Sequence, residues 1–189
     1  DTERWVLEDN MYICEEDTSG GGETVNLDDC LVYTSTDPKA YVFIDGYIKK
    51  YLLPSSDHIY IGKGFKTLQF YKTPDTDGDT MYNQGLEKID LSHLDTSTMT
   101  SMKNMFLSCS DLKEIIFGDN FNSSNVTNMD DCFGKCEKLT SIDTSKINVS
   151  NVTTIKNCFA NCTNLSVLDL SSWNVSKLIY LGDLFKNCI

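Results

Sequence analysis

The string F-x-x-C recurs four times in the second half of the chain, and its spacing constrains the fold more than any other feature. Successive phenylalanines of these strings are 27, 26 and 26 residues apart, and Met, Ile or Leu stands four residues before each of them. A unit of this length cannot bury its apolar face alone, so neighbouring units are expected to stack and share one core. The expected core positions are Phe106, Phe133, Phe159, Phe185, Met129 and Leu168.

Each unit divides into two halves with different apolar periods. Apolar residues alternate with polar ones in the first half, as at Leu168 and Leu170, which indicates a short strand. In the second half, Val126, Met129 and Phe133 share one stripe of a helical wheel, which indicates a short amphipathic helix. Strands pack closer together than helices, so such a stack curves with its strands inside. The sequence therefore predicts an α/β repeat fold, a curved leucine-rich-repeat-like solenoid.

The repeat also defines the expected domains. Residues 85–189 are expected to form the solenoid, whereas residues 1–84 lack the repeat and are interpreted as a β-rich N-terminal cap. In this cap, the Asp45-Gly46 turn between two apolar runs predicts a hairpin, and the cap would cover the exposed edge of the first unit. The four units are expected at residues 86–111, 112–138, 139–164 and 165–189.

The repeat is similar to that of a known family. The segment 165–178, LSVLDLSSWNVSKL, resembles the repeat of the BspA-like bacterial surface proteins, approximately LxxLDLSxWDTSxVTNMxxMFxxC, and Asn125–Met129 matches its middle. The resemblance covers residues 86–189, although the second unit has one inserted residue near Asn120 and Ile116-Phe117 in place of the usual LDL. It implies an extracellular or cell-surface protein, mature after signal removal, of a class in which many members are proposed to be adhesins.

Charge narrows the classes of partner. Lys and Arg number 16 against 28 Asp and Glu, which gives a net charge of −12 and disfavours nucleic acid as a partner. No apolar run is long enough to cross a membrane, and no catalytic or cofactor motif is present. The sequence favours a non-catalytic interaction module that binds a protein or glycan without a cofactor. An architectural spacer, or a hydrolase with its site in the N-terminal region, are the alternatives.

The outward-facing residues of the expected strands are the candidates for partner binding. Two explanations of their aspartates stay open: the carboxylates accept hydrogen bonds from adjacent loop N–H groups, or they present charge to a cationic partner. The last repeat has no closing unit after it, so self-association through this open end is also expected. The candidate binding residues are Lys88, Asp90, Glu114, Ile116, Asp143 and Asp169.

Eight cysteines raise the question of cross-links. Those of the F-x-x-C strings are interpreted first as small buried apolar residues. The helical wheel places Cys132 and Cys158 at the edge of the apolar stripe, so disulfides Cys109–Cys132 and Cys136–Cys158 are an alternative, and a zinc site of repeat cysteines a further one. Outside the repeats, Cys14 and Cys30 form a third candidate disulfide.

One loop has a weak resemblance to a calcium-binding sequence. Carboxylates alternate at Asp75, Asp77 and Asp79, as in a calcium loop, but the later positions of an EF-hand do not match. An exposed loop between the two parts of the chain is the alternative explanation, and no metal is otherwise expected.

Overall fold

The computed structural model describes residues 6–8, 11–13, 28–36, 40–46, 48–52, 56–70 and 85–188. These residues form short strands, turns and extended coil, and their only helix is a single 3-10 turn, η1 (Thr144–Lys146). The strands are β1 (Val6–Glu8), β2 (Met11–Ile13), β3 (Cys30–Ser35), β4 (Tyr41–Ile44), β5 (Ile48–Tyr51), β6 (Ser56–Tyr60), β7 (Leu68–Gln69), β8 (Leu86–Asp90) and β9 (Glu114–Ile116).

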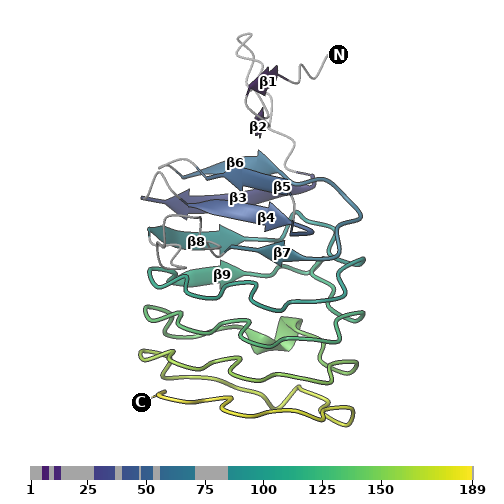
Figure 1. Ribbon diagram of the computed structural model, residues 1–189, viewed down its shortest axis with the longest axis vertical. Coiled ribbons are helices and arrows are strands. Elements are labelled where there is room, and N and C mark those ends of the chain that lie inside the picture. The colour runs from purple at the N-terminus through teal and green to yellow at the C-terminus, as the bar shows by residue number, and fades with distance from the viewer. Residues whose placement is uncertain are drawn as a thin grey trace.

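Three small sheets organise the strands. One is the β1–β2 hairpin, one has the order β5-β4-β7, and the largest has the order β6-β3-β8-β9. In the largest sheet, β3 is antiparallel to both β6 and β8, whereas β8 and β9 are parallel. The sheet therefore crosses the expected boundary at residue 84 and joins the N-terminal region to the first two repeats (Figure 1).

The hairpin predicted around Asp45-Gly46 is confirmed. Strands β4 and β5 pair antiparallel on either side of this turn. Asp45 has φ 52° and Gly46 has φ 74°, and two successive positive φ angles are the signature of a type I′ turn.

Successive repeats lie one on another below β9 (Figure 1). Parallel bridges join Ser101 to Asn128, Asn128 to Thr154, and Thr154 to Tyr180, each residue pairing with its equivalent in the next repeat. The phenylalanine rings form a ladder that begins in the N-terminal region at Phe70. Ring centroids are 5.4 Å apart for Phe70–Phe106, 5.4 Å for Phe106–Phe133, 5.2 Å for Phe133–Phe159 and 5.8 Å for Phe159–Phe185.

The helix predicted in each repeat is wrong. Around Phe133, the N–H groups of Cys132, Gly134 and Cys136 donate to carbonyl oxygens three residues earlier, which makes a run of tight turns. The alternate N–H groups point instead to the next repeat, and each repeat is called one coil of the stack. The N–H of Phe133, for example, donates to the carbonyl oxygen of Cys158 in the following coil at 2.8 Å. An α-helix cannot form such bonds, because its N–H groups are used within the helix.

Positive φ angles explain why the turns form in place of a helix. They occur two residues before and two residues after each phenylalanine of the four F-x-x-C strings, where Asn or Asp stands in six of eight cases. Asn and Asp tolerate this left-handed conformation better than other residues with a side chain, and a right-handed helix does not contain it. The positions are Asn104, Ser108, Asp131, Lys135, Asn157, Asn161, Asp183 and Asn187.

Replacing Asn157 by alanine distinguishes the two conformations by the sign of its effect. Asn157 has φ 53°, so alanine is expected to lower the free energy of unfolding by about 1 kcal/mol, whereas in a helix alanine would raise it. Urea denaturation measures the difference. Asn157→Gly serves as the control and is expected to be close to neutral, because glycine adopts this φ without strain. A more stable alanine variant would contradict the turn geometry.

Candidate binding face

One edge of the largest sheet brings together loops from distant parts of the chain. Because β3 runs antiparallel to β6 and β8, and β9 parallel to β8, the start of β3 and the ends of the other three strands meet at this edge. The residues that flank these strand ends line a hollow of about 320 Å³. Its lining residues are Asp28, Asp29, Lys63, His93, Leu94, Asp95 and Asn120.

Asp29 ties the walls of this hollow together. It has φ 60°, and its N–H donates to the carbonyl oxygen of His93 at 2.9 Å. Its own carbonyl oxygen accepts from the N–H of Ile61 at 2.9 Å, and its carboxylate pairs with Lys63 at 3.4 Å. Residues before β3, after β6 and after β8 are thus fixed to one another by a single residue.

The hollow carries an excess of negative charge. The lining contains three carboxylates, those of Asp28, Asp29 and Asp95, and one lysine, Lys63. Hydrogen bonds from the side chain and N–H of Ser97 lower the pKa of Asp95, and Lys63 lowers it further, so this carboxylate is ionised at neutral pH. No pattern in the sequence indicates these charged residues as a site, since they share no motif and are brought together only by strand pairing.

The candidate residues from the first two repeats pair with each other. Lys88 and Glu114 are neighbours across β8 and β9, and their side chains form an ion pair of 3.1 Å. Asp90 and Ile116 pair two positions further along the same strands, and both side chains are half-buried. These four residues therefore lie on one face of the β8–β9 pair.

The aspartates at the ends of the strand segments form Asx turns. Asp90, Asp143 and Asp169 each accept a hydrogen bond from the N–H of the serine two residues later, at 2.9, 3.1 and 2.8 Å. The bonds from Ser171 lower the pKa of Asp169. These carboxylates therefore accept hydrogen bonds from loop N–H groups, which is one of the two explanations left open by the sequence. Asp143 and Asp169 nevertheless remain exposed to solvent. The parallel bridge between Ser141 and Val167 aligns them in successive coils.

The cysteines of the repeats are free thiols, and the disulfides Cys109–Cys132 and Cys136–Cys158, the alternative interpretation of these residues, are not formed. The thiol of Cys136 donates to the carbonyl oxygen of Phe106 at 3.2 Å. The alternative relied on a helical wheel, whereas turns replace the helix, and Cys132 interacts with its repeat equivalent, Cys158. Cys14, of the proposed pair with Cys30, lies outside the described residues.

Burial keeps these thiols protonated. It raises the pKa of Cys132 and Cys136, which are fully buried, and it raises the pKa of Cys162 to about 12. Three of the F-x-x-C cysteines bond the carbonyl oxygen of the phenylalanine in the preceding coil. They are Cys136, Cys162 and Cys188, with distances of 3.2, 3.0 and 3.0 Å.

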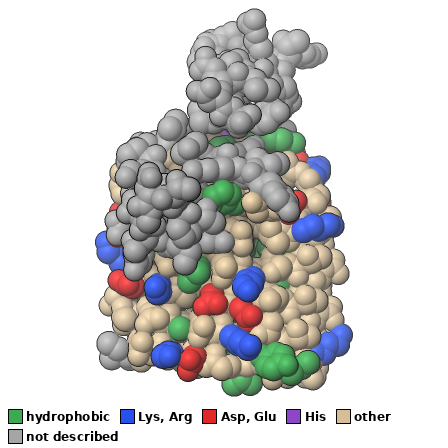
Figure 2. All heavy atoms as spheres, viewed as in Figure 1, with side chains coloured by type: hydrophobic (Ala, Val, Ile, Leu, Met, Phe, Trp, Pro, Cys, Tyr) green, Lys and Arg blue, Asp and Glu red, His purple; other side chains and the backbone are tan. Residues whose placement is uncertain are grey.

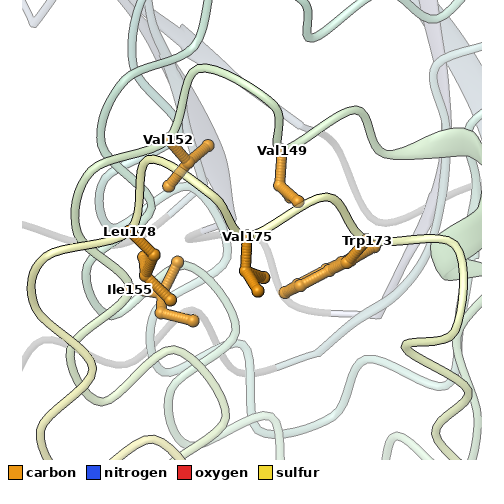
Figure 3. A pocket seen from close by; sticks show the side chains of 6 residues that line it. All are labelled: Val149, Val152, Ile155, Trp173, Val175 and Leu178. Atoms are coloured by element: carbon orange, nitrogen blue, oxygen red, sulfur yellow. The ribbon is translucent and has the colours of Figure 1, made fainter.

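The residues expected to form the core of the repeats differ in burial along the stack. Phe106, Phe133, Phe159 and Met129 are fully buried, Leu168 is half-buried, and Phe185 in the last coil is 46% exposed. A small apolar crevice lies between the third and fourth coils, where Trp173 packs near Val149 and Val175 (Figure 3). The crevice has no room for a water molecule, with an accessible volume of about 0 Å³.

Among the described residues, no cluster of three or more His, Cys, Asp or Glu side chains could hold a metal ion, and no helix is long and apolar enough to cross a membrane. Asp75, Asp77 and Asp79, the candidate calcium ligands, lie outside the described part of the chain.

Comparisons with known proteins place the repeats in a family. No curated protein and no solved structure matches the chain. A protein-family model does match residues 76–189, which include all four repeats and more than half of the sequence. The chain therefore belongs to the family described as "Mycoplasma protein of unknown function, DUF285".

Proposed function

We propose that this chain is a non-catalytic interaction module that binds a basic segment of a partner protein along the acidic edge of its largest sheet. The observation that carries the proposal is the convergence of Asp28, Asp29 and Asp95 around the hollow, whose lining contains one lysine, Lys63, and no arginine. A cationic side chain that enters the hollow would replace water around several carboxylates at once. The net charge of −12 would also draw a basic partner toward the molecule.

The exposed aspartates of the later coils extend this surface. Asp143 and Asp169 already have their Asx-turn bonds, so their carboxylates are held in fixed orientations. A fixed charge loses little conformational entropy when a partner binds. The face therefore offers oriented negative charges, and these support a basic protein ligand more strongly than a glycan, the other partner class expected from the sequence.

We further propose that the repeats form a leucine-rich-repeat-like solenoid of a cell-surface or secreted protein. Parallel bridges between equivalent residues and the phenylalanine ladder support the solenoid, although turns take the place of helices. The resemblance to BspA-like surface proteins supports the location. An architectural spacer is the second candidate function, because the continuous ladder is suited to holding the two ends of the stack apart.

Neutralising the aspartates is expected to weaken binding of a basic probe, an octalysine peptide. The double variant Asp143→Asn and Asp169→Asn keeps the Asx-turn acceptors and removes two charges, and we expect about a tenfold higher Kd by fluorescence anisotropy. Asp95→Asn should raise the Kd by about threefold. Added salt should reduce both effects.

The matched control removes the same charge elsewhere. Glu137→Gln with Asp183→Asn changes two exposed carboxylates of the turn segments that form no Asx turn at a strand end, and it should alter the Kd by less than about twofold. An equal loss in the control would show unspecific attraction and contradict the proposed face. Unchanged binding in all variants would instead favour the spacer.

A further inference from the structure

Two buried cysteines lie opposite each other at the junction between the second and third coils. Cys132 and Cys158 each stand directly before a phenylalanine of the ladder, and both side chains are fully buried. The N–H of Phe133, which follows Cys132, donates to the carbonyl oxygen of Cys158 at 2.8 Å. The N–H of Asp131, which precedes Cys132, donates to the carbonyl oxygen of Lys156, also at 2.8 Å. These two bonds fix the register of Cys132 against Cys158.

The spacing of the two coils suits a disulfide. The neighbouring rings of Phe133 and Phe159 stack with centroids 5.2 Å apart and planes 4° apart, so the coils are aligned at this position. Backbones joined by such hydrogen bonds lie about 4.8 Å apart, and the Cα atoms of a disulfide usually lie about 4.4–6.8 Å apart. The side chains of Cys132 and Cys158 also hydrogen-bond each other. A bond between their sulfur atoms therefore requires little movement of the backbone.

These two cysteines differ from those of the F-x-x-C strings. The position equivalent to Cys132 is Met105 in the first coil and Leu184 in the fourth, so two cysteines meet there at one junction alone. The F-x-x-C cysteines are also stacked in successive coils, but their thiols are directed at backbone carbonyl oxygens. Cys136 and Cys162 donate to phenylalanine carbonyl oxygens of the preceding coil at 3.2 and 3.0 Å.

We propose that Cys132 and Cys158 form a disulfide when the chain folds in the presence of a small disulfide such as oxidised glutathione. The thiolate of one cysteine attacks oxidised glutathione and releases one glutathione, and the thiolate of the other then attacks the mixed disulfide and releases the second. Two cysteine thiols are thereby oxidised to one S–S bond. One glutathione disulfide is reduced to two thiols, which take up the two protons. The bond links the second and third coils, and the inference is independent of the proposed partner.

Burial determines when the bond forms and how long it lasts. The thiolate is the attacking species, and burial raises the pKa of the Cys132 thiol in the folded chain. Neither side chain has exposed surface, and on the face shown in Figure 2 backbone atoms and polar or charged side chains make up most of the surface of the repeats. The exchange therefore takes place before the two coils close on each other. The folded chain then shields the bond from reductants.

Refolding of the reduced chain tests the pairing. The chain is unfolded in urea, diluted into a buffer with oxidised and reduced glutathione, alkylated and digested with trypsin. Cys132 is the one cysteine of the tryptic peptide 114–135, and Cys158 shares peptide 157–177 with Cys162, so fragmentation in the mass spectrometer identifies which of the two is linked. We expect the Cys132–Cys158 link in at least about tenfold excess over a link from peptide 136–138, which contains Cys136.

Oxidation of the chain kept in urea is the matched control. No register is fixed there, and short loops close most readily, so Cys132 and Cys136 are expected to pair with each other as well. Oxidation of the purified folded chain needs no refolding and should give the same Cys132–Cys158 link more slowly. Dithiothreitol should reduce this link in urea and leave it intact in the folded chain.

The cross-linked chain should also unfold at a higher urea concentration than the reduced chain. Closing a loop of this length in the unfolded state is expected to raise the midpoint by about 1 M. Cys132→Ala should show neither the link nor this shift. Alkylation of both Cys132 and Cys158 in a chain that has recovered its urea transition would overturn the inference. The same mixture of pairs in the refolding buffer and in urea would overturn it too.

Discussion

Phe133→Ala and Phe159→Ala are each expected to lower the free energy of unfolding by about 3–5 kcal/mol. Both rings are fully buried, and each stacks on a ring above and a ring below at 5.2–5.8 Å. Alanine would leave a cavity between two coils whose spacing is fixed by backbone hydrogen bonds on the same segment. The surrounding structure therefore has little freedom to close over the cavity.

Phe185→Ala is the matched comparison for this pair. Its ring contacts Phe159 on one side and is 46% exposed, so its loss should cost only about 1–2 kcal/mol. Urea denaturation of the three variants gives the comparison directly. Equal losses at the three positions would contradict a stack that is open at its last coil.

The folded chain is expected to lose stability steeply above pH 9. Burial raises the pKa of Cys162 from its ordinary value of 9.0 to about 12 and raises those of Cys132 and Cys136. A thiol whose pKa is raised in the folded state contributes its full stability below the unfolded pKa. This contribution is lost as the pH rises through the folded pKa, because only the unfolded chain then gains by ionising. The slope is roughly 1.4 kcal/mol per pH unit for each such thiol.

Removing one thiol separates its contribution to the pH dependence of stability from those of tyrosines and lysines, which also titrate above pH 9. Cys162→Ala should be less stable at pH 7, and its unfolding free energy should fall less steeply between pH 9 and 11, by roughly 1.4 kcal/mol per pH unit. Urea denaturation at several pH values measures both slopes. Parallel curves for the parent chain and the variant would contradict the buried, protonated state of Cys162.

The sequence predicted the stacking better than the local conformation. The 26-residue spacing of the phenylalanines was enough to predict one shared core, because only stacked equivalents can bury them all. The helix was wrong because spacings of three and four residues between apolar positions fit a run of three-residue turns as well as a helical stripe. The distinguishing signal was present in Asn104, Asp131 and Asn157, which stand two residues before the ladder phenylalanines and favour positive φ.

The candidate site was less accessible to sequence reasoning. Asp143 and Asp169 could be found because they recur with the repeat, and their Asx turns follow from the Asp-x-Ser order. The hollow could not be found in this way, since Asp29 and His93 are 64 residues apart and meet only because β3 pairs with β8. No periodic pattern encodes a contact between the N-terminal region and the repeats.

The alternation of N–H groups at the coil junctions has a consequence for how such proteins change in length. Every junction uses the same donors and acceptors in the same direction, and the ladder begins once, on Phe70. Gene duplication or deletion of one whole unit would therefore leave each remaining junction with a complementary neighbour. An insertion of one residue within the run of turns would break the match between N–H donors and carbonyl acceptors at the junctions with both adjacent coils. Evolution is thus expected to vary the number of units freely while it preserves the length of the turn run and the segment that starts the stack.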